Sequence, residues 1–401
     1  MATPKTSNEE LRDALIRHQT YLMRFSSALR NQVWDILDAT EQDVFERIVA
    51  RLRRNTGLTT QVELRRMQAL IAQIEIIRQR AWTQVDDLMR EELVALSLRE
   101  AEMIDETVRI TMPVQIITTV PSTRLLRAIA TSRPFQGHIL SEWVDAMSIE
   151  DMRRIQTAVQ LGMTAGESNE TIARRVTGTT TLGGRNGQTE LTRRQVQAIT
   201  RTAVNFIANE ARTAFFRQNA DIVTQERYVA TLDSRTTPIC RANDGELYEL
   251  GKGPIPPLHF NCRSLRIAVI DGTLLGDRPA KPFVERELVS DYARRRNLGD
   301  ITRRSDLPYG SKGDFDRWKR NRIQQIVGPV PATTTYQTWL KQQSTTFQND
   351  TLGVTKAKLF RQGGLTLDRF VDRAGNELNL AQLARKERDA FIAAGLNPDE
   401  F

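Results

Sequence analysis

Residues 228–269 read YVATLDSRTTPICRANDGELYELGKGPIPPLHFNCRSLRIAV, and this stretch decides how the rest of the chain is organised. It contains both cysteines and one of the three histidines of the chain. Helical periodicity precedes it, whereas proline and glycine interrupt the residues that follow. Short apolar and β-branched runs at 228–232, 246–250 and 265–270, the second after an Asp-Gly turn, predict three β-strands. We therefore expect a small β-rich knuckle, defined as residues 228–269.

The loop between the second and third predicted strands determines which side chains meet. It reads GKGPIPPLHFNC over residues 251–262. Proline fixes φ and removes a backbone donor, while glycine permits unusual φ, so we expect neither a helix nor a central strand there. The loop must fold back locally. This return should bring Cys240 towards His259 and Cys262.

These three side chains allow several kinds of chemistry. A structural zinc site uses four cysteine or histidine ligands, and His259 with Cys262 is an acceptable half-site, but Thr237 and Ser264 stand where further ligands would help. An aspartate of the knuckle, Asp233 or Asp244, or a water could complete the shell. Two buried free thiols beside a hydrogen-bonded histidine, or a disulfide, are the alternatives. A catalytic Cys-His pair is disfavoured because no third group is marked to orient it.

The order of residues in the knuckle resembles a known signature. The runs DSRTTPIC, DG and PPLHFNCR are similar to those of the phage head morphogenesis family, the Mu F-like minor head proteins of tailed bacteriophages. The residues outside the three possible ligands that match are Asp233, Arg235, Thr236, Pro238, Asp244, Gly245, Pro256, Pro257, Asn261 and Arg263. Many members carry cysteine where Thr237 and Ser264 stand here. The helical stretch 148–219 also resembles the segment that precedes the motif in the family.

The resemblance implies a structural role and no catalysis. It predicts a minor head protein, present in the virion near the portal vertex, with portal protein as its partner and a role in head assembly, DNA packaging or DNA ejection. Packaged DNA and other head proteins are further possible partners. Two alternatives stay open, namely a nonspecific DNA-binding virion protein, and a metal-dependent nucleic-acid hydrolase that uses Asp233, Cys240 and His259.

Composition is compatible with this interpretation. The chain has 401 residues, with 57 Lys and Arg against 49 Asp and Glu, which gives a net charge of +8. This excess permits nucleic-acid contact without requiring it. The basic run at Arg294, Arg295 and Arg296 is the segment that we expect to contact nucleic acid. Two cysteines exclude a disulfide framework. No apolar run is long enough to span a bilayer, so we expect a soluble protein that is made in the host cytoplasm.

Helical periodicity dominates the first half of the chain. Apolar residues recur at helical spacing over 11–36, 44–52 and 64–96, and the third run predicts one very long helix. This helix could pack as a hairpin on the first helices or project as an arm. His18 falls on the first apolar stripe, where we expect a core or interface histidine rather than a ligand.

Shorter helices are predicted in the middle of the chain. Residues 125–130 and 139–147 form two of them, and Ser148 with Asp151 starts another. The helix, glycine turn and helix over 161–176 invite a DNA-reading hypothesis, but such pairs usually reflect ordinary packing. Thr192 with Gln195 starts an alanine-rich helix that should be buried beside the knuckle.

The complete prediction is a mainly α, α+β protein. A helical body with long N-terminal helices carries the small β-rich knuckle and a small C-terminal helical appendage. Residues 1–112 form an N-terminal helical arm, 113–275 the Mu F-like core, and 276–401 a linker and the appendage. Within the last segment we expect a short helix over 283–296, whereas residues 306–331 are rich in charge, glycine and proline.

Overall fold

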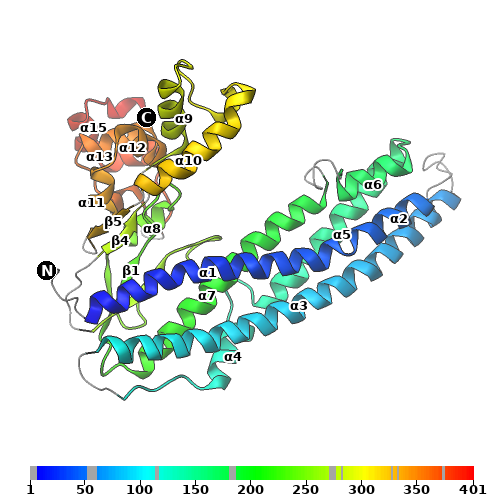
Figure 1. The fold of residues 1–401 in the computed structure, drawn as a ribbon, viewed down its shortest axis with the longest axis horizontal. Coiled ribbons are helices and arrows are strands. Elements are labelled where there is room, and N and C mark those ends of the chain that lie inside the picture. The colour runs from blue at the N-terminus through cyan, green and yellow to red at the C-terminus, as the bar shows by residue number, and fades with distance from the viewer. Residues whose placement is uncertain are drawn as a thin grey trace.

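The structure, a computed structural model, describes residues 7–51, 61–112, 117–179, 187–270, 277–280, 283–326, 328–331, 334–372 and 375–401. Long helices extend from one end of the molecule, and a small sheet and a group of short helices lie at the other end (Figure 1). The chain is mainly α-helical with a small antiparallel β component, which confirms the predicted fold class.

Three long helices form the body of the molecule. They are α1 (Ser7–Asp38), α3 (Gln61–Thr111) and α7 (Thr189–Gln218), and each packs against the other two. The 51 residues of α3 extend for about 77 Å at the usual helical rise. Two further helices, α4 (Thr123–Ser132) and α5 (Leu140–Thr164), pack on α3. The predicted long helix is confirmed, and it lies along α1 instead of projecting alone.

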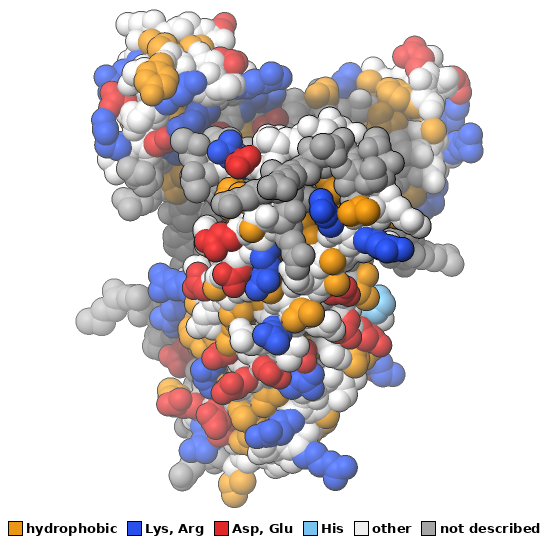
Figure 2. All heavy atoms as spheres, turned by 90° about the vertical axis from the view of Figure 1, so that its right-hand side faces the viewer, with side chains coloured by type: hydrophobic (Ala, Val, Ile, Leu, Met, Phe, Trp, Pro, Cys, Tyr) orange, Lys and Arg blue, Asp and Glu red, His pale blue; other side chains and the backbone are white. Residues whose placement is uncertain are grey.

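The far end of the body is closed by two short helices. These are α2 (Glu41–Arg51) and α6 (Asn169–Thr177), which pack against each other and against α3 and α5. Figure 2 views the molecule from this side and shows acidic and basic side chains interspersed over the visible face. The helix-turn-helix pair of the sequence is therefore the junction of α5 and α6, and its apolar side chains pack into a core with α2 and α3.

The expected helix start at Ser148 is wrong, because α5 continues through it. Asp151 is almost completely buried and accepts hydrogen bonds from Arg78 Nε at 2.8 Å, Trp82 Nε1 at 3.1 Å and Thr192 Oγ1 at 2.8 Å. The carboxylate thus joins α3, α5 and α7 instead of supporting a helix start. For the same reason Thr192 lies inside α7, which begins one turn earlier than predicted.

Three strands are present, as predicted, but the first spans 225–229 instead of 228–232 and therefore begins before the knuckle. They are β1 (Gln225–Val229), β2 (Leu247–Glu249) and β3 (Leu265–Val269), arranged antiparallel in the order β2-β1-β3. All five residues of β3 are buried. The sheet packs in one apolar cluster with ends of α1, α3 and α7, to which Leu11, Ile104 and Phe215 contribute. The knuckle is therefore attached directly to the helical body.

The chain after the knuckle contains a helix that the sequence did not indicate. A second small sheet pairs β4 (Asp277–Ala280) with β5 (Gly328–Pro331). The predicted helix is present as α9 (Glu285–Arg295), and the stretch that is rich in charge, glycine and proline contains α10 (Lys312–Ile326). The apolar residues of α10 are sparse, and its Phe315 and Trp318 pack on Tyr292 of α9. Tertiary packing stabilises this helix where its own periodicity gives little signal.

The C-terminal appendage is a group of short helices, as predicted. Its α-helices are α11 (Tyr336–Lys341), α12 (Thr345–Leu352), α13 (Val354–Arg361), α14 (Leu380–Lys386) and α15 (Arg388–Ala393). They surround a core that includes Trp339 and Phe347. Leu232 of the knuckle belongs to this same core, so the appendage is docked on the knuckle.

The proposed division into three segments concerns independent folding and stays a prediction. One apolar core contains Leu29 of α1 and Val85 of α3 together with Val144 of α5 and Ile207 of α7. This shared core argues against separating residues 1–112 from the helices that follow. Within the described residues, no helix is long and apolar enough to cross a membrane.

Candidate metal centre in the knuckle

Local sequence positions Cys240 on a short helix. Thr237 adopts an extended conformation ahead of α8 (Pro238–Asn243), whose first residue is proline. Proline suits the first turn of a helix because its missing N–H would have no partner there. Sequence reasoning missed α8, although a threonine followed by proline is a recognised start signal. The helix turns the Cys240 side chain into the knuckle, where it is almost completely buried.

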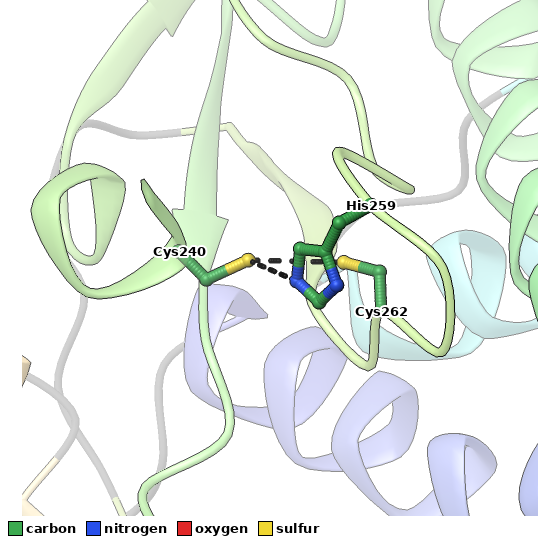
Figure 3. A group of neighbouring side chains, drawn as sticks. All are labelled: Cys240, His259 and Cys262. Atoms are coloured by element: carbon green, nitrogen blue, oxygen red, sulfur yellow. Dashed lines mark hydrogen bonds between the residues drawn. The ribbon is translucent and has the colours of Figure 1, made fainter. Parts of the chain in front are cut away.

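The structure brings Cys240, His259 and Cys262 together (Figure 3). The Cys240 Sγ atom lies 3.2 Å from His259 Nε2 and 3.8 Å from Cys262 Sγ. One ligand atom from each residue lies within 4.8 Å of the other two. Cys240 comes from α8, whereas His259 and Cys262 come from the loop between β2 and β3. The expected return of this loop is therefore present, and both cysteines are free.

Hydrogen bonding fixes which nitrogen of His259 faces the sulfurs. The Nδ1 atom lies 2.8 Å from the backbone oxygen of Phe260. A carbonyl oxygen only accepts, so Nδ1 carries a proton and donates it to this bond. In the neutral ring, the lone pair of Nε2 then points towards Cys240 and towards Thr237 Oγ1, which is 2.8 Å away. Metal-binding histidines commonly show this arrangement, with one nitrogen held by a carbonyl and the other free to bind.

The two thiols have different electrostatic environments. The hydrogen bond from Cys262 lowers the pKa of Cys240, and the contacts with His259, Ser264 and Thr237 lower it further against the opposing effect of burial. The hydrogen bond with Cys240 and burial both raise the pKa of Cys262. Burial also raises the pKa of Tyr228, whose hydroxyl group donates to Cys240 Sγ at 3.2 Å. Cys240 is thus the thiol that holds a negative charge more readily.

The spacing of the three ligands fits a small tetrahedral metal ion. With zinc–sulfur bonds of about 2.3 Å, two sulfurs in a tetrahedral shell lie about 3.8 Å apart. The two sulfurs here are separated by 3.8 Å. Among the described residues, the group has no fourth cysteine, histidine or carboxylate. Thr237 and Ser264 both lie beside the group, since each forms a hydrogen bond with one of its members.

The two aspartates considered as a fourth ligand serve other purposes, so that expectation is wrong. The Asp233 carboxylate binds the Arg263 guanidinium at 2.5 and 2.9 Å. The Asp244 carboxylate accepts the backbone N–H of Ala230 at 2.7 Å and of Tyr336 at 2.6 Å. The hydrolase hypothesis loses its geometric basis as well, because Asp233 points to Arg263 rather than joining the Cys240 group.

The other motif residues shape the loops of the knuckle. Thr236 donates to the backbone oxygen of Thr231, and the peptide bond between Pro256 and Pro257 is cis. Gly245 has φ of +89° and Asn261 has φ of +59°. Glycine adopts such values freely, and asparagine tolerates them better than most residues. The backbone geometry of the loops therefore accounts for the presence of these residues in the motif.

The candidate DNA-contacting arginines lie at the end of α9, away from the three ligands in sequence. Arg295 pairs with Asp291 at 3.1 Å, and the Arg296 guanidinium lies 5.7 Å from the centre of the Tyr292 ring. The Nε atom of Arg294 donates to the Ser290 carbonyl oxygen at 3.4 Å. All three side chains are exposed. Their contact with DNA stays a prediction.

A family model matches the middle of the chain. Residues 153–267 match the family model described as phage Mu protein F like protein. The match begins within α5 and ends within β3, so it covers α6, α7 and nearly all of the knuckle. It confirms the resemblance to the phage head morphogenesis family. Searches of curated proteins and of solved structures found no match.

Proposed function

We propose that this protein is a minor head protein of a tailed bacteriophage that associates with the portal protein during head assembly. The observation that carries the proposal is the family match over residues 153–267. This segment lies at the junction where the helical body, the knuckle and the appendage meet. A protein built around such a junction suits a structural role. Among the described residues, the group of Cys240, His259 and Cys262 contains no carboxylate that could act as a base.

Co-purification with portal protein tests this function. Tagged portal protein from the same phage should retain the chain at moderate salt, because an interface with an apolar centre depends mainly on buried nonpolar surface. Association through DNA phosphates alone would instead weaken steeply as salt rises. Nuclease treatment before capture provides the control for bridging by DNA. Failure to bind portal protein, together with metal-dependent DNA cleavage that His259→Ala abolishes, would replace the structural role with the hydrolase alternative.

A role in DNA packaging or DNA ejection is part of the same proposal. Virions that lack the chain should separate the two roles. Normal DNA content with poor infection would favour ejection, whereas heads without DNA would favour assembly or packaging. The presence of the chain in purified virions, near the portal vertex by labelling, would support the virion location. Its absence from virions would contradict that location.

We also propose that Cys240, His259 and Cys262 hold one zinc ion, with water as the fourth ligand. The fit of the two sulfurs to a tetrahedral shell supports this proposal. Elemental analysis should find close to one zinc per chain, and chelation should loosen the loop between β2 and β3, because metal binding stabilises folded structure. Protein free of metal, with thiols that react only after unfolding, would select the buried-thiol alternative.

A further inference from the structure

Four arginines come together where the knuckle meets α1 and α7. They are Arg30 of α1, Arg201 of α7, and Arg235 and Arg263 of the knuckle, and we call them the arginine cluster. Arg263 binds the Asp233 carboxylate through both terminal nitrogens, and the backbone N–H of Arg235 donates to the same carboxylate at 3.0 Å. Arg201 contacts Asn261 of the knuckle, and the charges of Arg30, Arg235 and Arg263 all act on Arg201, so three separate parts of the chain contribute cations to one region.

Hydrogen bonds of Gln19 and Asn261 hold the parts of this region together. Arg201 Nη1 donates to Asn261 Oδ1 at 3.4 Å. The backbone N–H of Asn261 donates to Thr202 Oγ1 at 3.0 Å, which places the loop against α7. Gln19 Nε2 of α1 donates to the Arg263 carbonyl oxygen at 3.4 Å. The region is thus built on helices and hydrogen-bonded loops, so its cations occupy defined positions.

The arginine cluster has more positive charge than the surrounding groups neutralise. Within the described part of the chain, Arg263 has a carboxylate partner, whereas Arg30, Arg201 and Arg235 form no ion pair. Burial and then the charges of Arg263, Arg30 and Arg235 lower the pKa of Arg201. By contrast, Arg193 and Arg194 on the same helix pair with acidic residues. Positive charges held close together in this way favour the binding of an anion between them.

We propose that the arginine cluster is a binding site for phosphate groups of the DNA backbone. Guanidinium groups bind phosphate through paired N–H donors and remain charged at all ordinary pH values. Arg263 already pairs with a carboxylate, that of Asp233. The other cations are spread over α1, α7 and the knuckle. This distribution suits the repeated phosphates of DNA better than a single carboxylate of an acidic protein. The choice of DNA as the ligand rests on the proposed head function. The binding test itself does not, because it uses the isolated chain.

The Arg201→Gln variant tests the site, with Arg194→Gln on the same helix as its matched control. Binding of a short labelled DNA duplex is measured at several salt concentrations. We expect Arg201→Gln to weaken binding uniformly across sequences and to reduce the slope of log affinity against log salt by about one, as for one lost phosphate contact. Arg194→Gln should leave both quantities unchanged because Glu190 already pairs with this arginine. Equal losses in the two variants would overturn the proposal.

Further measurements show whether the variant remains folded and which ligand the site binds. Arg201→Gln removes repulsion, so its melting temperature should not fall, and Arg30→Gln provides a second variant at a different element. Inorganic phosphate should raise the melting temperature of the wild type more than that of Arg201→Gln, because only a ligand of the native state stabilises it. Polyglutamate that competes as well as DNA would overturn the phosphate assignment in favour of an acidic protein partner. Capture of Arg201→Gln by portal protein should persist, which keeps this test independent of the head function.

Discussion

At the scale of single residues, some residues of the knuckle motif can bind a metal ion and the others stabilise the loops around them. Asp233 is of the second kind, because its buried carboxylate holds Arg263 and the backbone of Arg235. Burial alone would raise the pKa of Asp233, but the hydrogen bonds and charge of Arg263 outweigh burial and lower it. The carboxylate therefore stabilises the folded protein when it is ionised.

This balance predicts how the stability contributed by Asp233 depends on pH. Near neutral pH, Asp233→Asn should lower the free energy of unfolding by about 1.5–3 kcal/mol, the usual loss for a hydrogen bond to a charged group. The contribution is present above the pKa of an unfolded aspartate, about 4, and is lost as pH falls through the lowered pKa of the folded state. Urea unfolding over a pH series measures the difference between the two proteins.

An exposed ion pair provides the control for this prediction. Asp399 also pairs with an arginine, Arg388, but both side chains are more than half exposed. Asp399→Asn should therefore change the stability little. A difference between wild type and Asp233→Asn that stays constant as pH falls well below 4 would contradict the role given to the Asp233 charge.

Thr237 offers a second prediction at the residue scale. Its hydroxyl oxygen lies 2.8 Å from His259 Nε2, at the edge of the three-ligand group. Thr237→Cys should add a thiolate ligand and tighten zinc binding, because four protein ligands complete a structural site. Competition with a coloured chelator measures the zinc affinity. Ser234→Cys adds a thiol outside the group and should leave the affinity unchanged, and equal gains in both variants would contradict the geometry of the site.

At the scale of elements, the knuckle connects the appendage to the helical body. The Asp244 carboxylate bridges the backbone of Ala230, next to β1, and Tyr336, at the start of α11. The Tyr336 hydroxyl group in turn donates to the Asp233 carbonyl oxygen at 2.8 Å. Arg241 of α8 donates to the Thr351 carbonyl oxygen at 3.0 Å. These polar contacts add to the apolar contact of Leu232 with the appendage core.

The Asp244 bridge predicts a local effect on the appendage. Asp244→Ala leaves two buried N–H groups without their acceptor, which costs about 1–3 kcal/mol for each unsatisfied group. Hydrogen exchange at the Ala230 and Tyr336 amides should become faster, and protease should release the appendage earlier than in the wild type. Asp350→Ala is the control, because Asp350 pairs with the half-exposed Arg286. Unchanged exchange at Tyr336 in Asp244→Ala would contradict the bridge.

At the scale of the whole molecule, the N-terminal helices and the family segment share one apolar core. α1 and α3 cover α7 along the body, and their ends cover the sheet of the knuckle. The appendage differs because it has its own apolar core and meets the knuckle over a limited set of contacts. Removal of the two ends of the chain should therefore have different consequences.

Truncation tests this difference. A chain that ends at residue 270 should keep its helical content and a cooperative thermal transition, because the core of α1, α3, α5 and α7 remains intact. A chain that starts at residue 113 exposes the apolar faces of α5 and α7 and should aggregate or unfold. Circular dichroism and size-exclusion chromatography measure both outcomes. A soluble, folded chain without residues 1–112 would instead support the predicted N-terminal arm as a separate unit.

Several features of the fold could be predicted from local sequence patterns alone. Apolar residues at helical spacing predicted α1, α2 and α3, and short apolar and β-branched runs predicted the three strands, the second of them after the Asp244-Gly245 turn. The proline-rich loop after β2 required a local return, which placed Cys240 near His259 and Cys262. Local periodicity and turn chemistry are sufficient for such features because they act over a few neighbouring residues.

The partners of the buried polar residues, by contrast, depend on tertiary contacts. Ser148 and Asp151 have the pattern of a helix start, but a buried ion pair with Arg78 uses the aspartate and lets α5 continue. α10 has few apolar residues and depends on packing against α9. Asp233 and Asp244 resemble metal ligands in sequence, yet Arg263 and two backbone N–H groups bind them. A buried charge takes the partner that the fold brings within reach, and the distance along the chain does not reveal that partner.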